Sequence, residues 1–271
     1  RFTRVLEQFM IETRISVTFA DGSASPGAPD RALADTLKRR IQQGCPPDVA
    51  LLPQPGLLRS LAEDGRLRPI KGAARDEVER NYSPAWRELA TVDGEMYGVW
   101  FKAADKSRIW YDPAVFRAAH VTPSGTLAGL VQLADQLATA RFVPFSVGGA
   151  DGWTLTDWFE NVFLSLYGVD AYGQLADHRM DWTDPRVRKA LSFVAGVLAV
   201  DGWTVGGLSA TYEQSVDRVF ASAEAPRAAM VLAGDYAANQ VAASGTTTAA
   251  HWFDFPGLGG GRRVVGGDVA V

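Results

Sequence analysis

The most constraining feature of this sequence is the alternation of helix-like and strand-like hydrophobic patterns along the chain. One helical face near the beginning consists of Phe2, Val5, Leu6 and Phe9, and the alternating run after it consists of Ile15, Val17 and Phe19. A second helix is predicted by Leu33, Leu37 and Ile41, and Gly44 is its expected end. Residues 49–52 then form an apolar run that is typical of a strand covered on both faces.

The same alternation continues through the middle of the chain. Strands are predicted at residues 109–111 and 142–146, and helices at 57–61, 113–118 and 127–137. Asp184 before Pro185 is a typical helix start, because the carboxylate can cap the helix and proline suits its first position. The apolar stripe of that helix is predicted to consist of Leu191, Val194, Ala195 and Leu198. Strands separated by helices predict an α/β fold with mostly parallel sheets.

Composition and charge exclude several function classes. The 271 residues carry a net charge of −4, from 27 basic and 31 acidic residues that are spread along the chain, which argues against a nucleic-acid partner. Cys45 is the only cysteine, so an internal disulfide is excluded, and we expect it to be a small buried residue. The 3 histidines are far apart, so we expect neither a metal site nor a cofactor. No apolar run approaches the roughly 18 residues that a membrane helix needs.

Motifs for covalent chemistry or phosphate binding are incomplete. The stretch from Pro144 to Gly148 resembles a nucleophile elbow, but proline occupies the place of the first glycine. The glycines between 257 and 261 resemble a phosphate loop, but Arg262 replaces the last glycine and no lysine–serine pair follows. We therefore predict no catalytic residue.

Aromatic residues beside turns are the positive signal. The turn from Gly148 to Trp153 follows a predicted strand and precedes a helix, in which Thr154 and Asp157 have the spacing of a capping box. Trp158 falls on the apolar face of that helix and is predicted to lie in the core. Trp153 is interpreted as a residue that packs on Trp158, as a platform for a sugar ring, or as both. Asp151 is either a turn former or an acceptor for a ligand hydroxyl.

Further candidates follow other predicted strands. Gln54 lies after the run at 49–52, where open α/β sheets bind ligands, and could hold a hydroxyl or simply occupy a turn. Trp100 is equally compatible with a core position and a ligand platform. Asp235 and Tyr236 follow an apolar run and are expected at the end of a strand. Lys102 is interpreted as solvated.

The order of these segments resembles the extracellular solute-binding proteins of carbohydrate ABC importers, the group that includes maltose- and α-glucoside-binding receptors. The resemblance covers nearly the whole chain, although each segment alone is weak. The matching segments are Pro47–Ala50, Leu61–Leu67, Val92–Val99, Trp110–Phe116, Gly148–Trp153, Trp182–Pro185, Ala229–Met230 and Gly234–Tyr236.

The resemblance implies a two-lobed periplasmic-binding-protein-like fold that closes on a sugar and is recognised by a membrane permease. Lobe 1 would comprise residues 1–105 and be completed by 259–271, and lobe 2 would comprise 106–258. Crossings would lie near 103–106 and 257–262. Gln54, Trp153 and Tyr236 match cleft positions, and Asp268 lies in another segment that borders the cleft.

The resemblance also implies a monomer that works without a cofactor outside the cytoplasm, at the cell surface or in the periplasm, with a lipid anchor as one alternative. Tyr236 stands where the family often has tryptophan, which leaves the preferred sugar open. The family begins with a central strand, whereas this chain opens on a helix, so we expect truncation at both ends. A receptor for a non-sugar solute, such as a polyamine or ferric ion, and a carbohydrate-active enzyme remain as alternatives.

Overall fold

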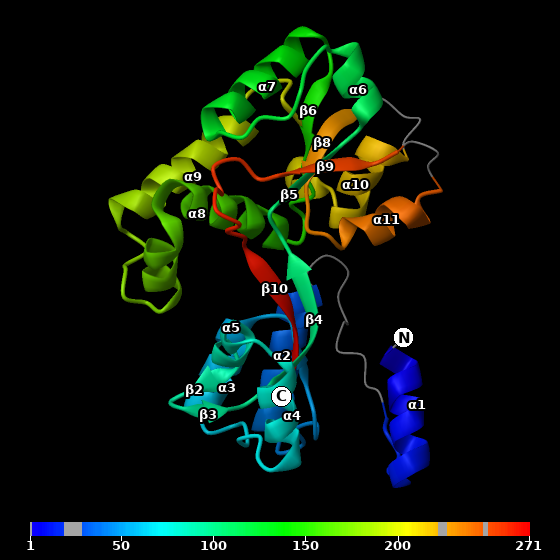
Figure 1. Cartoon of the computed structure of the whole chain (residues 1–271), viewed down its shortest axis with the longest axis vertical. Coiled ribbons are helices and arrows are strands. Elements are labelled where there is room, and N and C mark those ends of the chain that lie inside the picture. The colour runs from blue at the N-terminus through cyan, green and yellow to red at the C-terminus, as the bar shows by residue number, and fades with distance from the viewer. Residues whose placement is uncertain (1, 19–28, 222–226, 246–248) are drawn as a thin grey trace. The chain divides into compact units, whose positions relative to one another are not determined.

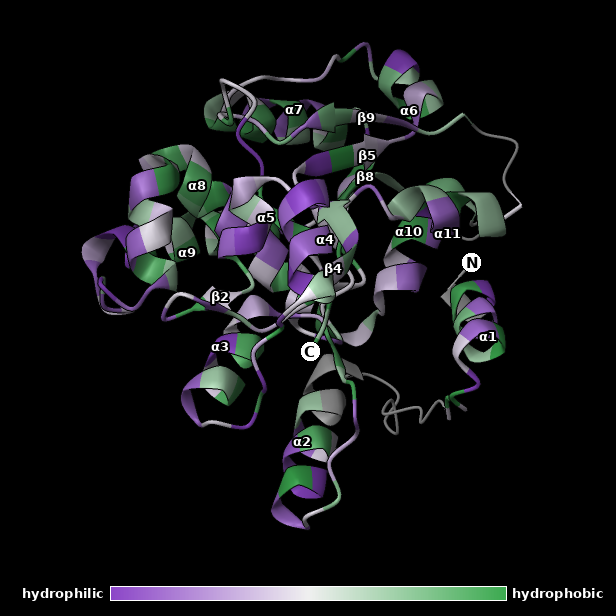
Figure 2. Cartoon of the chain, turned by 60° about the horizontal axis from the view of Figure 1, so that its bottom comes forward, coloured by the Kyte–Doolittle hydropathy of each residue, from purple (hydrophilic) through white to green (hydrophobic). Residues whose placement is uncertain are grey.

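The computed structural model describes residues 2–18, 29–221, 227–245 and 249–271, which belong to two compact units, Arg1–Pro47 and Asp48–Val271. The first unit contains α1 (Phe2–Thr13) and α2 (Pro29–Gln42), and both confirm predicted helices. Hydrophobic and hydrophilic residues alternate along α2 (Figure 2). The predicted strand at 15–19 is wrong as far as it is described, because residues 14–18 form no regular structure and Ile15 is exposed. Phe19 lies outside the described residues. Cys45 is exposed, which corrects the expectation of a buried thiol; it follows the end of α2, where no helix turn covers it.

The second unit contains a three-stranded sheet with the order β1 (Leu51–Leu52), β10 (Val265–Ala270) and β4 (Val99–Asp105), and both of its pairings are antiparallel. The prediction of a strand covered on both faces at 49–52 is wrong in part. Only Leu51 and Leu52 are in the strand, and Val49 is 62% exposed. The reason is that β1 lies at the sheet edge and pairs with β10 alone among the described strands.

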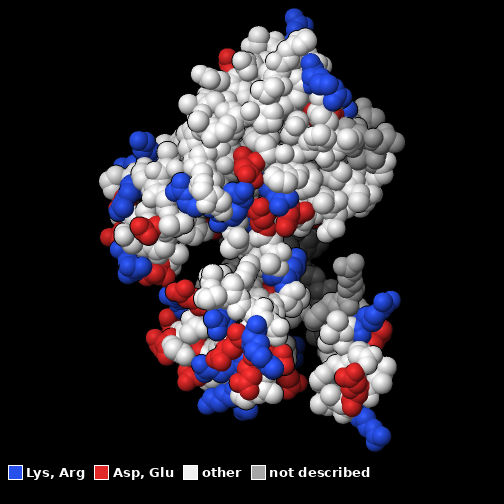
Figure 3. Space-filling model, in the orientation of Figure 1, with Lys and Arg blue, Asp and Glu red and all other residues white. Residues whose placement is uncertain are grey.

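Short elements connect β1 to β4. They are α3 (Pro55–Glu63), α4 (Ala73–Asn81), α5 (Pro84–Glu88), β2 (Thr91–Val92) and β3 (Glu95–Met96). Leu58 and Leu61 on α3 are buried, which confirms the predicted helix, and Gly65 with its positive φ of 66° follows the helix end. Lys, Arg, Asp and Glu intermix on the face of the molecule shown in Figure 3. On α4, Arg75 pairs with Glu79 and Arg80 with Glu77.

A five-stranded sheet follows, with the order β7 (Thr204–Val205), β6 (Val143–Ser146), β8 (Ala228–Leu232), β5 (Arg108–Tyr111) and β9 (His251–Asp254). Only the β7–β6–β8 part is parallel, because β5 runs antiparallel to both β8 and β9. The expectation of mostly parallel sheets is therefore wrong for the three-stranded sheet and holds for only half of the pairings in this one. The alternation of helices and strands does predict the α/β class correctly.

Helices cover the five-stranded sheet on both sides (Figure 1). They are α6 (Pro113–Ala118), α7 (Leu127–Thr139), α8 (Trp153–Ala176), α9 (Pro185–Leu198), the 3₁₀ turn Gly207–Ser209, α10 (Tyr212–Phe220) and α11 (Ala237–Ala243). One core cluster joins Ile109 and Met230 to residues of α7, α8 and α9, and another joins Trp110 and Val231 to residues of α10. Neighbouring residues of one strand thus enter opposite cores, which explains why all of β8 is buried.

The apolar stripe of α9 differs from the predicted one. The buried positions are Val187, Ala190, Val194 and Val197. Leu191 is 49% exposed and Ala195 is also exposed, so the stripe is rotated by about one residue from the expected face. The cause is packing against α8, which selects one of two adjacent apolar faces. Asp184 does cap the helix, because its side chain accepts a hydrogen bond from the Arg186 backbone N–H.

Two segments connect the sheets. The chain leaves the three-stranded sheet at Asp105, enters the five-stranded sheet at Arg108, and returns between Asp254 and Val265. The two segments are joined by backbone hydrogen bonds from Lys106 N–H to the Val264 carbonyl, at 2.9 Å, and from Phe255 N–H to the Ser107 carbonyl, at 2.9 Å. The division into lobes at 105/106 and 258/259 stays a prediction.

Candidate functional site

The candidate site lies at the edge of the five-stranded sheet where its parallel strands end. β6 leads into the turn before Trp153, β8 leads into the turn before Tyr236, and β7 leads through the 3₁₀ turn to Tyr212. Because these strands are parallel neighbours, the segments that follow them meet at one edge. β5 is antiparallel to β8, so Lys106, which precedes β5, arrives at the same edge.

Three aromatic rings meet there, and we call Trp153, Tyr212 and Tyr236 the aromatic triad. The ring centroids are 5.2 Å apart for Trp153–Tyr212, 6.0 Å for Trp153–Tyr236 and 5.5 Å for Tyr212–Tyr236. The interplanar angles lie between 45° and 65°, so the rings pack edge to face or tilted. All three side chains are half-buried. The triad is therefore a packed aromatic surface that still has accessible parts.

The turn before Trp153 is fixed by close backbone contacts. Gly149 donates from its N–H to the Gly207 carbonyl at 2.8 Å, and a Cβ at Gly148 would lie 2.5 Å from the Thr211 carbonyl oxygen. Only glycine fits at position 148 without a shift of this backbone. This contact brings the turn beside the start of α10 and explains why Trp153 lies against Tyr212.

The predicted capping box at Thr154 and Asp157 is wrong. The helix cap is Gly152, and Trp153 is already the first helical residue. The Thr154 hydroxyl instead donates to the Gly148 carbonyl at 2.6 Å, inside the turn. Asp157 is only 2% exposed and faces the triad rather than the helix start. Trp158 is 2% exposed as well, which confirms its prediction as a core residue.

Asp157 is the centre of a buried polar group. One carboxylate oxygen accepts from the Lys106 ammonium at 2.9 Å, and the other accepts from the Tyr236 hydroxyl at 3.4 Å. Asn161, one turn later on α8, donates to the backbone carbonyls of Lys106 and Asp157. Burial raises the pKa of Asp157, and the charge and hydrogen bond of Lys106 oppose that rise. Lys106 thus favours the ionised form of a carboxylate that burial disfavours.

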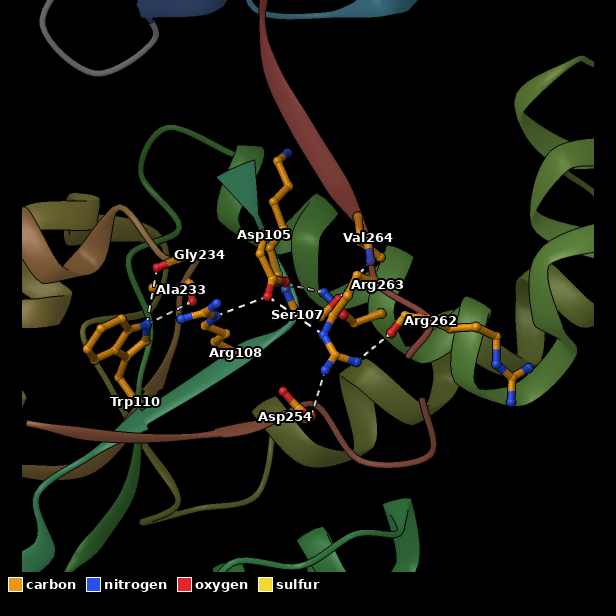
Figure 4. A network of polar contacts seen from close by, with 12 residues as sticks. Asp105, Ser107, Arg108, Trp110, Ala233, Gly234, Asp254, Arg262, Arg263 and Val264 are labelled. Carbon is orange, nitrogen blue, oxygen red and sulfur yellow. Dashed lines mark hydrogen bonds and ion pairs between the residues drawn. The ribbon is translucent and has the colours of Figure 1, made fainter. Parts of the chain in front are cut away.

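The two segments between the sheets carry a second polar network beside the triad, shown in Figure 4. The Asp105 carboxylate accepts from the Ser107 backbone N–H at 2.9 Å and from the Arg108 guanidinium at 3.0 Å, and Arg263 lies 3.6 Å away. Arg263 also binds Asp254 at 2.7 Å. The backbone N–H of Asp235 donates to the Asp105 carbonyl at 2.9 Å. This network therefore continues into the turn that carries Tyr236.

The other predicted site residues lie in different surroundings. Asp151 and Asp235 are half-buried, and neither carboxylate has an ion pair or side-chain hydrogen bond with a described residue. Gln54 is exposed at the start of α3 and makes no side-chain capping bond. Asp268 on β10 pairs with Lys102 at 3.1 Å. Trp100 is 4% exposed and packs on Trp86, which favours its core interpretation.

From the sequence, Trp153 and Tyr236 were predicted as site residues. Tyr212 and Lys106 were not predicted, and Asp157 was assigned to a helix cap. Tyr212 was missed because β7 has only 2 residues and gave no strand pattern. A signal for the buried polar group was present: Asp157, Glu160 and Asn161 lie at i, i+3 and i+4 on an otherwise apolar helix. Polar residues that share one face of a buried helix need partners, and such a face predicts a buried network.

Among the described residues, no group of three or more His, Cys, Asp or Glu side chains could hold a metal ion. Within the same ranges, no helix combines the length and apolarity needed to cross a bilayer. A separate shallow concavity of about 400 Å³ on α9 is lined by Trp182, Thr183, Arg188, Leu191, Ser192 and Ala195, none of which belongs to the triad.

Comparison with known protein families gives a match over residues 2–271 to the family described as bacterial extracellular solute-binding protein. The chain is 34% identical over 196 residues to the osmoprotective compounds-binding protein GgtB of Synechocystis, which covers 69% of this chain and 47% of that protein. It is 30% identical over 236 residues to the alpha-glucosides-binding periplasmic protein AglE of Rhizobium meliloti, covering 82% and 50% respectively. The chain thus spans about half the length of these curated relatives.

Solved structures share the fold. The binding protein RafE in complex with raffinose superposes with a TM-score of 0.74 at 21% identity, over 99% of this chain and 69% of that one. The receptor AcbH, described as having an exclusive preference for β-D-galactopyranose, superposes with a TM-score of 0.73 at 22% identity, over 100% and 67%. At these identities the likeness concerns the fold alone, and it confirms the predicted two-lobed binding-protein architecture.

Proposed function

The chain belongs to the bacterial extracellular solute-binding protein family, and from that premise we propose that it is the receptor of an ABC-type sugar importer. It would capture a mono- or oligosaccharide between two lobes, residues 1–105 with 259–271 and residues 106–258, and deliver it to a membrane permease. Membership of this family implies a location outside the cytoplasm. A lipid anchor and a monomeric state stay predictions.

The observation that carries this proposal is the convergence of three aromatic rings at the carboxyl edge of parallel strands. A pyranose has apolar C–H faces and a polar rim, so it binds flat aromatic surfaces with hydrogen-bonding groups around them. The Tyr212 hydroxyl supports this proposal, because it is buried and has no hydrogen-bond partner among the described residues. Such a group is costly unless a ligand or water satisfies it. Asp151 and Asp235 would select hydroxyl positions at the rim.

Gln54 and Asp268 would contribute from the lobe that contains the three-stranded sheet, and Trp100 would contribute only through the packing of that lobe. The names of the relatives support a saccharide, since AglE is named for alpha-glucosides and RafE was solved with raffinose. The family and these neighbours are binding proteins. The proposal therefore includes no turnover: the ligand would favour the closed state through its higher affinity for that state.

A second candidate is a receptor for a cationic solute such as a polyamine. The observation in its favour is that Asp151 and Asp235 lie next to members of the triad, and neither has an ion pair with a described residue. Aromatic faces also attract ammonium groups. A polyamine receptor would use the same site as a sugar receptor, and the two candidates differ only in the chemistry of the ligand.

The test is a thermal-shift and calorimetric screen of the protein against mono- and oligosaccharides, with polyamines in parallel and each sugar checked for breakdown. We expect a saturable rise in melting temperature for a saccharide that remains intact. Trp153→Ala should weaken binding at least about tenfold, since loss of one stacked aromatic residue at a binding hot spot costs about 1.4 kcal/mol or more.

Trp182→Ala is the matched control, because this tryptophan is 58% exposed and lies outside the triad. The Trp182→Ala variant should bind the saccharide with the same affinity as the unchanged protein. Binding of a polyamine but of no sugar would transfer the proposal to the second candidate. Conversion of a sugar to products would contradict a receptor.

A further inference from the structure

The Tyr236 hydroxyl is held by a carboxylate that can hardly be reached by solvent. The side chain of Asp157 is 3% exposed, and its oxygens face Lys106 and Tyr236, at 2.9 Å and 3.4 Å. Burial and the neighbouring Asp157 charge both raise the pKa of Tyr236, which keeps the phenol protonated and able to donate. The single hydroxyl hydrogen of Tyr236 is thus directed at Asp157.

Two glycines leave space for the Tyr236 ring and the Lys106 side chain, and Asn161 holds the backbone of Lys106. A Cβ at Gly234 would lie 2.3 Å from the Tyr236 ring, so glycine is required for the ring to fold back over its own turn. A Cβ at Gly266 would lie 2.7 Å from Cε of Lys106, so this second glycine leaves the space that the lysine side chain occupies. Asn161 binds the Lys106 carbonyl at 3.1 Å. The sequence therefore provides room for both partners of Asp157.

Hydrogen-bond accounting gives a consequence for ligand recognition. A tyrosine hydroxyl has one hydrogen to donate and can also accept. Asp157 takes the hydrogen, and the backbone N–H of Gly234 takes one accepting position of the oxygen. The remaining accepting position of the oxygen is what a ligand can use. The oxygen would then recognise an O–H or N–H donor and discriminate against a group that can only accept.

We propose that Asp157 is a positioning residue, with Lys106 as its counter-charge, which orients the Tyr236 hydroxyl so that it accepts a hydrogen bond from a donor group of the ligand. This inference rests on the proposed function for its ligand and on the geometry alone for the orientation of the hydroxyl. For a saccharide it means that one particular hydroxyl is read as a donor. Neither Asp157 nor Lys106 has to touch the sugar.

The first experiment tests the orientation without any ligand. The Raman doublet of tyrosine distinguishes a phenol that donates a hydrogen bond from one that accepts, and subtraction of the Tyr236→Phe spectrum isolates Tyr236. We expect the signature of a hydrogen-bond donor in the unchanged protein. It should be lost in the double variant Lys106→Met/Asp157→Leu, which removes both members of the ion pair together.

Tyr82→Phe is the control subtraction, since the Tyr82 hydroxyl donates to the Trp100 carbonyl and not to Asp157 or Lys106. Its difference spectrum should be the same in the unchanged protein and in the double variant. A Tyr236 signature that does not depend on Asp157 would overturn the proposal.

The second experiment tests the specificity with methyl α-D-glucopyranoside and its monodeoxy and monodeoxyfluoro derivatives. Fluorine can accept but not donate, so at the recognised position both derivatives should lose affinity alike, by about tenfold or more. In the double variant Tyr236 is free to donate, and the fluoro derivative should bind several-fold more tightly than the deoxy one. If the ratio of affinities for the fluoro and deoxy derivatives were the same in the unchanged protein and in the double variant, Asp157 would have no role in specificity.

A glucoside that does not bind at all would count against the proposed function for this class of sugar. The Raman difference would still decide the orientation of Tyr236. Failure of the proposed sugar-binding function and failure of the proposed orientation of Tyr236 can therefore be told apart.

Discussion

The two sheets of the second unit are stabilised in different ways. In the five-stranded sheet every residue of β8 is buried, and the side chains of β5 and β8 enter cores on both faces. In the three-stranded sheet, the central residues of β4 from Phe101 to Ala103 are exposed, and β10 carries two adjacent glycines, Gly266 and Gly267. The first sheet depends on apolar burial, whereas the second depends on backbone pairing over a long register.

This contrast limits where a ligand site can be built. A sheet with helices on both faces offers a stiff edge, and the triad lies at the carboxyl edge of such a sheet. A narrow antiparallel sheet with small residues is suited to connecting two bodies. The four predictions below test this contrast, beginning with the largest expected effect.

Trp158→Ala should cause the largest loss, because it removes a tryptophan in edge-to-face contact with Phe145 and Phe255, at 5.3 and 6.0 Å. We expect the free energy of unfolding to fall by about 3–5 kcal/mol, measured by urea denaturation. Trp153→Ala should cost clearly less stability, since its side chain is half-buried. If Trp158→Ala and Trp153→Ala lost the same free energy of unfolding, the distinction between Trp158 as a core residue and Trp153 as a ligand platform would be wrong.

Gly267→Ala tests the three-stranded sheet. A Cβ there would lie 2.0 Å from the Lys102 carbonyl oxygen, so β4 and β10 would have to separate locally. We expect a loss of about 1–3 kcal/mol in the same denaturation assay, accompanied by faster hydrogen exchange in β4. The matched control is Gly259→Ala, whose Cβ would meet nothing nearer than 3.9 Å. A Gly267 variant as stable as this control would show that the close pairing is dispensable.

Ser107→Ala tests the junction between the sheets. The Ser107 hydroxyl is fully buried and accepts the Val264 backbone N–H at 2.8 Å. Its removal leaves a buried donor without a partner, which should cost about 1–2 kcal/mol, visible as a lower melting temperature. Ser209→Ala, at an exposed serine that bonds only to Gly206, should change stability by less than about 0.5 kcal/mol. If Ser107→Ala and Ser209→Ala had the same melting temperature, the junction between the sheets would not depend on the hydrogen bond from Val264 to Ser107.

The smallest effect concerns Asp184 at the start of α9. Hydrogen bonds from the side chain and backbone of Arg186 lower the pKa of this carboxyl to about 2. Because the folded pKa lies below the usual value of 3.8, the contribution of the carboxylate to stability is complete above pH 4 and is lost as the pH falls through about 2. NMR titration of the carboxyl carbon in the folded protein should show this midpoint. A midpoint near 4 would mean that the cap does not form in solution.

Local patterns predicted the helices of this fold better than its sheets. Capping at Asp184 and the helix end at Gly44 depend on neighbours in sequence, and both were predicted. Pairing directions were not, because a strand pattern says nothing about its partner: β5 and β8 are both strongly apolar, yet their pairing is antiparallel. The face of α9 was misjudged at Leu191, since two adjacent stripes are apolar and only contact with α8 decides between them.

For the site, the sequence identified Trp153 and Tyr236 as aromatic residues that follow strands. Their proximity depends on β6 and β8 being parallel neighbours, which is a property of the whole sheet. Tyr212 reaches the same place through a strand too short to predict. Asp157 was assigned to a helix cap because the spacing from Thr154 fits one, but burial beside Lys106 gives it a different partner.

The position of β10 has a consequence for the order in which the molecule can be completed. It follows every other described strand in sequence, yet it lies between β1 and β4, which do not pair with each other. While the chain is being synthesised, both of those strands must wait for residues made after the whole five-stranded sheet, and this late pairing closes a long loop. The larger sheet can therefore assemble first, and the facing edges of β1 and β4 remain unpaired, available to chaperones or to wrong partners, until β10 is made.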